Sequence, residues 1–90
     1  MADEEKIKAL RLEIDAIDER LVRLLCDRAR VAREIGIAKG GVGIYRPQRE
    51  KIVLERAVQN AKNYGSILTA DAVATLYREI MRACRSVEKD

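Results

Sequence analysis

An apolar period that runs unbroken through the first part of the chain constrains the fold most. Residues 5–39 contain no proline, and apolar side chains recur there at alternating spacings of three and four residues. These positions are Ile7, Leu10, Ile14, Ile17, Leu21, Leu24, Val31, Ile35 and Ala38. Such spacing places them on one face of an α-helix, and the glycines that follow, Gly40, Gly41 and Gly43, end it. The pattern predicts one helix over residues 5–39, about 50 Å long at 1.5 Å per residue.

Two shorter helices are expected after the glycines. Pro47 suits the first turn of a helix, and a stripe at helical spacing continues from there to Gly65. Thr69 is a candidate N-cap for the next helix, whose first turn carries Asp71. The apolar positions are Val53, Leu54, Ala57, Ala61 and Tyr64, then Val73, Leu76, Tyr77, Ile80, Met81, Cys84 and Val87. No stretch has the pattern of a strand, so we expect an all-α fold of three helices in one domain over residues 1–90.

The long helix needs more partners than its own chain provides. A compact chain of this size has a radius of gyration near 12 Å and a diameter of about 30 Å. The two shorter helices cannot cover the whole apolar stripe, and an uncovered stripe drives association. We therefore expect an intertwined homodimer whose long helices cross as an antiparallel pair. Gly36 lowers helix propensity within the long helix, and close packing of another backbone is the expected reason.

Composition narrows the chemistry and the partners. The chain has no histidine, so it lacks the usual base of hydrolases and a common zinc ligand. The net charge is +3, with the two signs interspersed, which favours a small anionic ligand over nucleic acid. Cys26 and Cys84 match no metal or redox spacing, and neither a signal sequence nor a membrane-spanning apolar run is present. We expect a reduced, cytoplasmic protein with no metal, nucleic-acid or membrane partner.

Several charges lie where apolar residues are expected. Arg28 interrupts the apolar stripe. Lys39 is rotated about the helix axis by only about 20° from Arg28 and lies roughly 16 Å further along that axis. Two such side chains can close around one small ligand. Arg11 lies about 25 Å from Arg28 along the same helix, so only an antiparallel partner can bring it to that ligand. The expected pocket holds Arg28 and Lys39 of one subunit and Arg11 of the other, with Glu50 and Glu88 on facing helices.

Each of these side chains also has a purely structural interpretation. A charge at a packed seam needs an anionic partner, and an ion pair between Arg28 and Glu50 would serve as well as a ligand. Lys39 can simply complement the negative end of the helix. The other candidates can be ordinary surface or core side chains. These are Arg11, Arg49, Glu50 and Glu88 on helix surfaces, and Cys84 in the core.

Taken together, these residues carry a family resemblance. The motifs are Leu10-Arg11, Ile14-Asp15 with Ile17-Asp18, Leu24-Leu25 with Asp27-Arg28, residues 36–39, Arg46-Pro47-Gln48-Arg49-Glu50, and Ile80-Met81 with Cys84 and Glu88. The set resembles the all-helical chorismate mutases of the AroQ class. Residues 45–47 and 80–84 look most like the mutase domain at the amino end of bifunctional chorismate mutase/prephenate dehydratase proteins.

The resemblance implies a fold and an activity. It implies an intertwined helical homodimer with shared active sites that converts chorismate to prephenate, at the branch point towards phenylalanine and tyrosine. The reaction is a unimolecular rearrangement in which one C–O bond breaks as a C–C bond forms. No nucleophile, metal or cofactor is required. The implied partners are the small dianion chorismate and a fused or associated prephenate dehydratase.

The resemblance also implies roles for individual residues. Arg28 and the partner subunit's Arg11 match the carboxylate-binding arginines. Lys39 matches the lysine at the ether oxygen and ring hydroxyl, Glu50 the acceptor from that hydroxyl, and Glu88 the residue facing the ether oxygen. The implied catalytic residues are thus Lys39, Glu50 and Glu88, and the implied substrate-binding residues are Arg11, Arg28, Lys39, Arg49, Glu50, Cys84 and Glu88.

Departures from the family pattern and rival functions qualify this interpretation. The turn at residues 40–44 is short and glycine-rich, Arg46 stands where many relatives carry an acid, and Cys84 is only a weak hydrogen-bond donor. Relatives of such a pocket also remove pyruvate from isochorismate or rearrange aminodeoxychorismate. A third alternative is a helical dimerisation or nucleic-acid module, against which the interspersed acids and the scarcity of aromatic residues argue.

Overall fold

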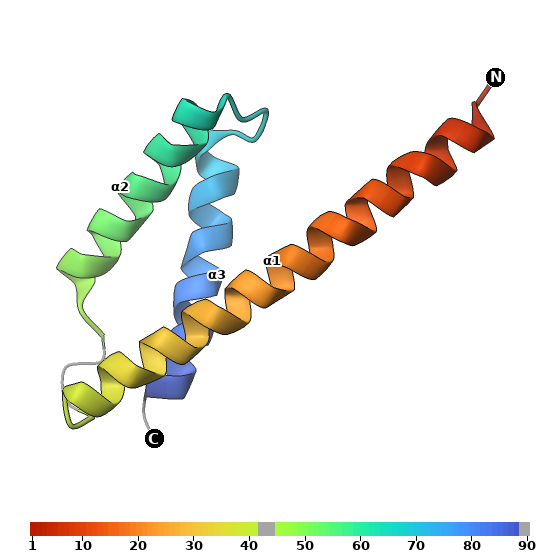
Figure 1. The fold of residues 1–90 in the computed structure, drawn as a ribbon. Coiled ribbons are helices and arrows are strands. Elements are labelled where there is room, and N and C mark those ends of the chain that lie inside the picture. Colours follow the sequence, from red (N-terminus) through yellow and green to blue (C-terminus); the bar gives the residue numbers. More distant parts are fainter. Residues whose placement is uncertain (42–44, 89–90) are drawn as a thin grey trace.

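The computed structural model describes residues 1–41 and 45–88 and contains three helices in them (Figure 1). Helix α1 spans Glu4–Ala38, α2 spans Pro47–Tyr64 and α3 spans Ala70–Glu88. No strand occurs among these residues, so the predicted all-α class and the order of one long and two shorter helices are confirmed. The predicted turn extends through Gly43 and Ile44, which lie outside the described residues.

Local signals define both ends of α1. The Asp3 side chain caps the first turn by accepting a hydrogen bond from the Lys6 amide at 3.0 Å. At the other end, Gly40 and Gly41 have φ values of 66° and 77°, a left-handed conformation that glycine adopts without steric cost. Each end of α1 lies one residue before the predicted position.

The ends of the shorter helices follow the same logic. Pro47 is the first residue of α2, and Gly65 closes that helix with φ at 79°. The Thr69 hydroxyl accepts a hydrogen bond from the Ala72 amide at 3.1 Å, which confirms the predicted cap of α3. Helices α2 and α3 run antiparallel, which places the start of α2 and the end of α3 on the same side of the molecule (Figure 1).

Helix α3 is the centre of the arrangement. Its backbone lies close to both other helices, whereas within the described residues no Cα atom of α1 lies within 8 Å of one of α2. The carboxyl-terminal half of α1 crosses α3, and its amino-terminal half projects away as an arm (Figure 1). Helices α1 and α2 thus form the two sides of a V, and α3 packs against both.

Close approach of two backbones fixes the crossing of α1 and α3. A Cβ atom added to Gly36 would lie 2.5 Å from the carbonyl oxygen of Glu88 and 2.9 Å from its Cα atom. Only glycine permits this contact, so the predicted reason for Gly36 is confirmed. The contact holds the last turn of α3 against α1.

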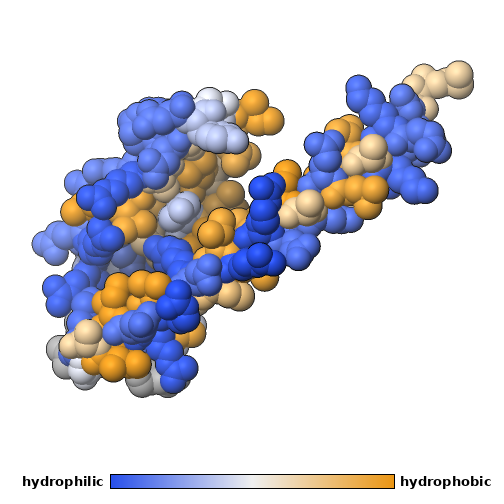
Figure 2. All heavy atoms as spheres, in the orientation of Figure 1, coloured by the Kyte–Doolittle hydropathy of each residue, from blue (hydrophilic) through white to orange (hydrophobic). Residues whose placement is uncertain are grey.

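The buried core of the single chain is small. In the described part of the chain, the buried apolar residues are Ala32, Ala57, Val73, Met81 and Cys84. Leu76, which the stripe of α3 predicts to be buried, is 55% exposed, and apolar side chains also stay exposed along the arm of α1 (Figure 2). The radius of gyration is 16.7 Å, well above the 12 Å or so of a compact chain of this length. No helix within the described residues is long and apolar enough to cross a membrane.

Candidate active site

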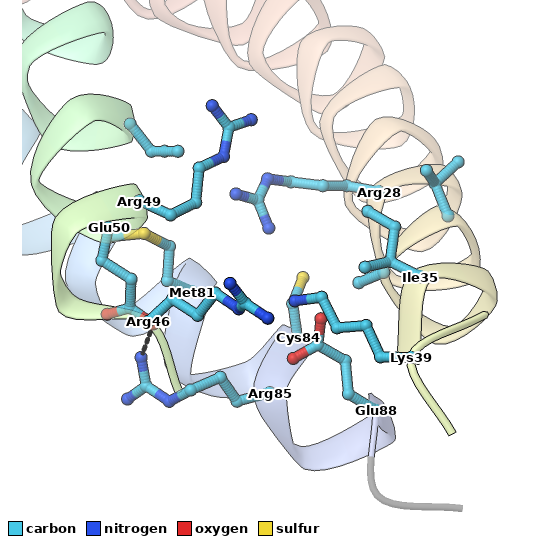
Figure 3. A pocket seen from close by; sticks show the side chains of 13 residues that line it. Arg28, Ile35, Lys39, Arg46, Arg49, Glu50, Met81, Cys84, Arg85 and Glu88 are labelled. Carbon is cyan, nitrogen blue, oxygen red and sulfur yellow. Dashed lines mark hydrogen bonds and ion pairs between the residues drawn. The ribbon is translucent and has the colours of Figure 1, made fainter. Parts of the chain in front are cut away.

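A cavity of about 310 Å³ lies in the V between α1 and α2, with α3 as its floor (Figure 3). This volume is in the range of small-molecule sites. Its charged lining comprises Arg28, Lys39, Arg46, Arg49 and Arg85 with Glu50 and Glu88. The rest of the lining is formed by Val31, Ala32, Ile35, Val53, Met81 and Cys84. Basic side chains outnumber acidic ones, which suits a small anion with more than one negative charge.

The structure brings together all but one of the predicted site residues. Arg28 and Lys39 reach the cavity from α1 and its cap, Arg49 and Glu50 from the first turn of α2, and Cys84 and Glu88 from α3. Arg11 does not line it. Arg11 is exposed on the arm of α1. The helical rise between Arg11 and Arg28 predicts that Arg11 cannot reach the cavity of its own chain.

Two arginines of the cavity are available to bind anions. Arg28 is half-buried and points into the cavity, and Arg49 faces it from α2 (Figure 3). Within residues 1–41 and 45–88, neither guanidinium has an ion-pair partner. The structural alternative for Arg28, an ion pair with Glu50, is therefore not the one that the protein adopts.

Glu50 instead pairs with Arg85, a residue that the sequence analysis missed. The Arg85 guanidinium donates a hydrogen bond to Glu50 Oε2, which links α3 to α2 (Figure 3). The spacing of Met81, Cys84, Arg85 and Glu88 follows one face of α3. That spacing was the available signal, because it aligns Arg85 with two predicted site residues.

Arg46 is the second site residue that was not predicted, because it was recognised only as a departure from the family pattern. It immediately precedes α2, and its guanidinium points into the cavity towards Lys39 and Glu88 (Figure 3). Glu88, which the sequence analysis placed near a helix end, is the last residue of α3 and is half-buried. Its carboxylate thus lies among cationic groups from α1 and from the start of α2.

The arrangement of charged side chains can bind an anion and fix its orientation. Planar guanidinium groups engage carboxylates through paired hydrogen bonds, which fixes orientation as well as affinity. Among the described residues, no cluster of histidine, cysteine or acidic side chains has the arrangement of a metal site. The cavity is suited to chemistry that depends on ligand conformation and electrostatic stabilisation.

Comparison with known proteins connects this cavity to a family. The chain is 42% identical, over 94% of its length, to the bifunctional chorismate mutase/prephenate dehydratase of Aquifex aeolicus. It is also 42% identical, over 99% of its length, to the bifunctional protein of the same name from Pseudomonas aeruginosa. The chain spans only 24% and 26% of the length of these two relatives.

A protein named chorismate mutase from Methanocaldococcus jannaschii is 31% identical over 67% of this chain and 63% of that relative. No solved structure gives a significant match. The family model described as chorismate mutase type II matches residues 10–89, which include every cavity-lining residue. Because that match covers nearly the whole chain and agrees with the all-helical fold, the chain belongs to the chorismate mutase type II family.

Proposed function

We propose that this chain is a chorismate mutase domain, over residues 1–90, that rearranges chorismate to prephenate. The observation that carries the proposal is the cavity itself, where Arg28 and Arg49 stand without ion-pair partners among the described residues. Membership of the family supports the same substrate. The names of the bifunctional relatives support a prephenate dehydratase as a fused or associated partner.

Catalysis in this proposal is a matter of conformation and charge. Chorismate carries two carboxylates, and the rearrangement requires the folded conformer in which the reacting carbons approach. Arg28 holds one carboxylate, and Arg11 of the partner subunit holds the other. The free energy of binding offsets the entropy cost of ordering chorismate in the reactive conformer, and this lowers the barrier by several kcal/mol.

Hydrogen-bond donors stabilise the charge that develops as the C–O bond breaks. Lys39 donates to the ether oxygen and contributes a few kcal/mol, while Glu88 faces the same oxygen. Glu50 accepts a hydrogen bond from the ring hydroxyl, while Arg49 supports the bound ligand and Cys84 lines the pocket. No cofactor takes part, because the reaction transfers no electron or group between molecules.

A homodimer completes the site in this proposal. The apolar stripe on the arm of α1 is exposed in the single chain, with exposed fractions of 46% for Leu10, 55% for Ile14 and 51% for Ile17. Burial of such a stripe drives association. An antiparallel partner lying along it would bring the partner subunit's Arg11 to the cavity.

The test is the loss of chorismate absorbance with purified protein, with prephenate identified as the product. We expect turnover by the wild type and a loss of roughly 30- to 1000-fold in kcat/KM for Arg28→Ala, the effect of leaving a buried charge unpaired. Arg56→Ala, at an exposed arginine of α2 outside the cavity, is the matched control. Turnover of isochorismate or aminodeoxychorismate in place of chorismate would contradict the proposal.

A non-enzymatic role has its own signature. A dimerisation or nucleic-acid module would bind DNA in a salt-dependent manner, and chorismate would not raise its melting temperature. We expect the opposite result on both counts.

A further inference from the structure

The cavity contains arginines in two different situations. Arg28 and Arg49 have no ion-pair partner in the described part of the chain, whereas Arg85 is paired with Glu50. We propose that Arg85 is a positioning residue that orients the Glu50 carboxylate towards the ligand. The inference rests on the proposed function and adds a residue to it.

The Glu50–Arg85 pair differs from the surface ion pairs of the molecule. Its side chains are 21% and 28% exposed, and it joins two helices. Among the described residues, the pairs Arg23–Glu19, Arg30–Glu34 and Arg82–Glu79 join neighbours on one helix and have side chains 64–75% exposed. Exposed pairs contribute little because water and salt screen them, whereas a partly buried pair is screened less. The geometry of Glu50 therefore depends on Arg85.

An aromatic ring holds Arg85 in turn. The Cζ atom of Arg85 lies 5.1 Å from the centroid of the Tyr45 ring, within the range of a cation–π contact. Tyr45 immediately precedes Arg46 and the start of α2. The ring and the carboxylate thus hold one guanidinium at the edge of the cavity, where it points away from Arg28 (Figure 3).

The pairing leaves Glu50 able to act on a ligand. The bond to Arg85 uses Oε2, and the other carboxylate oxygen keeps its acceptor capacity. The pairing also prevents a competing interaction. Arg46 and Arg49 line the same cavity as Glu50. A carboxylate free to pair with those groups would neutralise charges that the ligand needs.

The experiment is a double-mutant cycle on kcat and KM for chorismate. It compares the wild type with Arg85→Leu, Glu50→Gln and the double variant, with Arg85→Lys as the conservative variant and Arg56→Ala as the control. We expect Arg85→Leu to lower kcat by roughly 10- to 100-fold, the cost of misplacing a catalytic group. In the Glu50→Gln background the same change should cost less than about twofold, because there is no carboxylate to orient.

Arg85→Lys should recover part of the lost kcat, since a point charge can pair with Glu50 but cannot reproduce the planar fork. Equal losses in the wild-type and Glu50→Gln backgrounds would overturn the positioning role. A rise in KM with unchanged kcat would also overturn it, because Arg85 would then bind the ligand directly. Should the wild type itself leave chorismate unchanged, the proposed function fails and the positioning role fails with it.

Discussion

At the scale of single residues, the cavity assigns different electrostatic situations to side chains of the same type. Arg28 and Arg49 are unpaired within the described residues, while Arg85 is held by Glu50 and by the Tyr45 ring. The geometry of one helix predicted that Arg28 and Lys39 would point the same way, because its rise and rotation per residue are known. It could not predict the Glu50–Arg85 pair, since nothing in the spacing of one helix reports which residue of another faces it.

Glu88 gives the sharpest prediction at this scale. An ionised carboxylate cannot donate a hydrogen bond and would repel negative charge developing on the ether oxygen. Glu88 lies beside Lys39 and Arg46 at the cavity, and Glu88→Gln replaces its carboxylate with a neutral amide that can donate a hydrogen bond. We expect kcat/KM of Glu88→Gln at neutral pH to exceed that of the wild type by roughly tenfold, because one donor is added and one negative charge removed at the ether oxygen.

The measurement is kcat/KM of both proteins at neutral pH. Glu79→Gln is the matched control, because Glu79 lies on the same helix, outside the cavity, and pairs with Arg82 on the surface. Its kcat/KM should equal that of the wild type. Equal values for the wild type and Glu88→Gln would show that Glu88 does not act on the ether oxygen.

At the scale of elements, the periodicity of apolar residues was sufficient to predict the three helices. The long helix ends within one residue of its predicted bounds, because Asp3, Gly40 and Gly41 are strong local signals. The crossing of α1 and α3 was partly predictable. A glycine inside a helix indicated close packing, but the sequence did not indicate that its neighbour would be the backbone of Glu88.

Gly36→Ala tests this crossing. Alanine favours the helix by about 1 kcal/mol, but its Cβ atom would lie too near the Glu88 backbone, and overpacking costs about 1–3 kcal/mol. We expect a lower melting temperature and a loss of roughly tenfold in kcat/KM, because the last turn of α3 must move. Ala9→Gly, at an exposed site on α1, measures helix propensity alone. A Gly36→Ala protein with unchanged activity and higher stability would contradict the account.

At the scale of the whole molecule, the extended shape of the chain indicates association with a partner. The chain extends over 57 Å in its longest dimension, and only a few apolar side chains are buried among residues 1–41 and 45–88. A single chain with so small a core is expected to gain much of its stability from association. The prediction of a shared site follows from this shape and from the position of Arg11 on the exposed arm.

Subunit complementation tests the shared site. Arg11→Ala and Arg28→Ala should each be nearly inactive alone. A mixed dimer has one site that lacks both arginines and one that is intact, so equal mixing should restore about a quarter of the wild-type rate. The measurement is chorismate turnover after subunit exchange, with exchange verified by a mass tag on one variant. An exchanged mixture that stays inactive would indicate sites contained within one chain.

The sequence by itself determined the helices, their ends and the alignment of Arg28 with Lys39, because these depend on interactions within a few turns of one backbone. Only the tertiary structure decided that Arg85 pairs with Glu50, that Arg46 points into the cavity and that Gly36 meets Glu88. Those contacts join residues far apart in the chain. They depend on the angle at which α3 crosses its neighbours, a property that arises from packing and not from local periodicity.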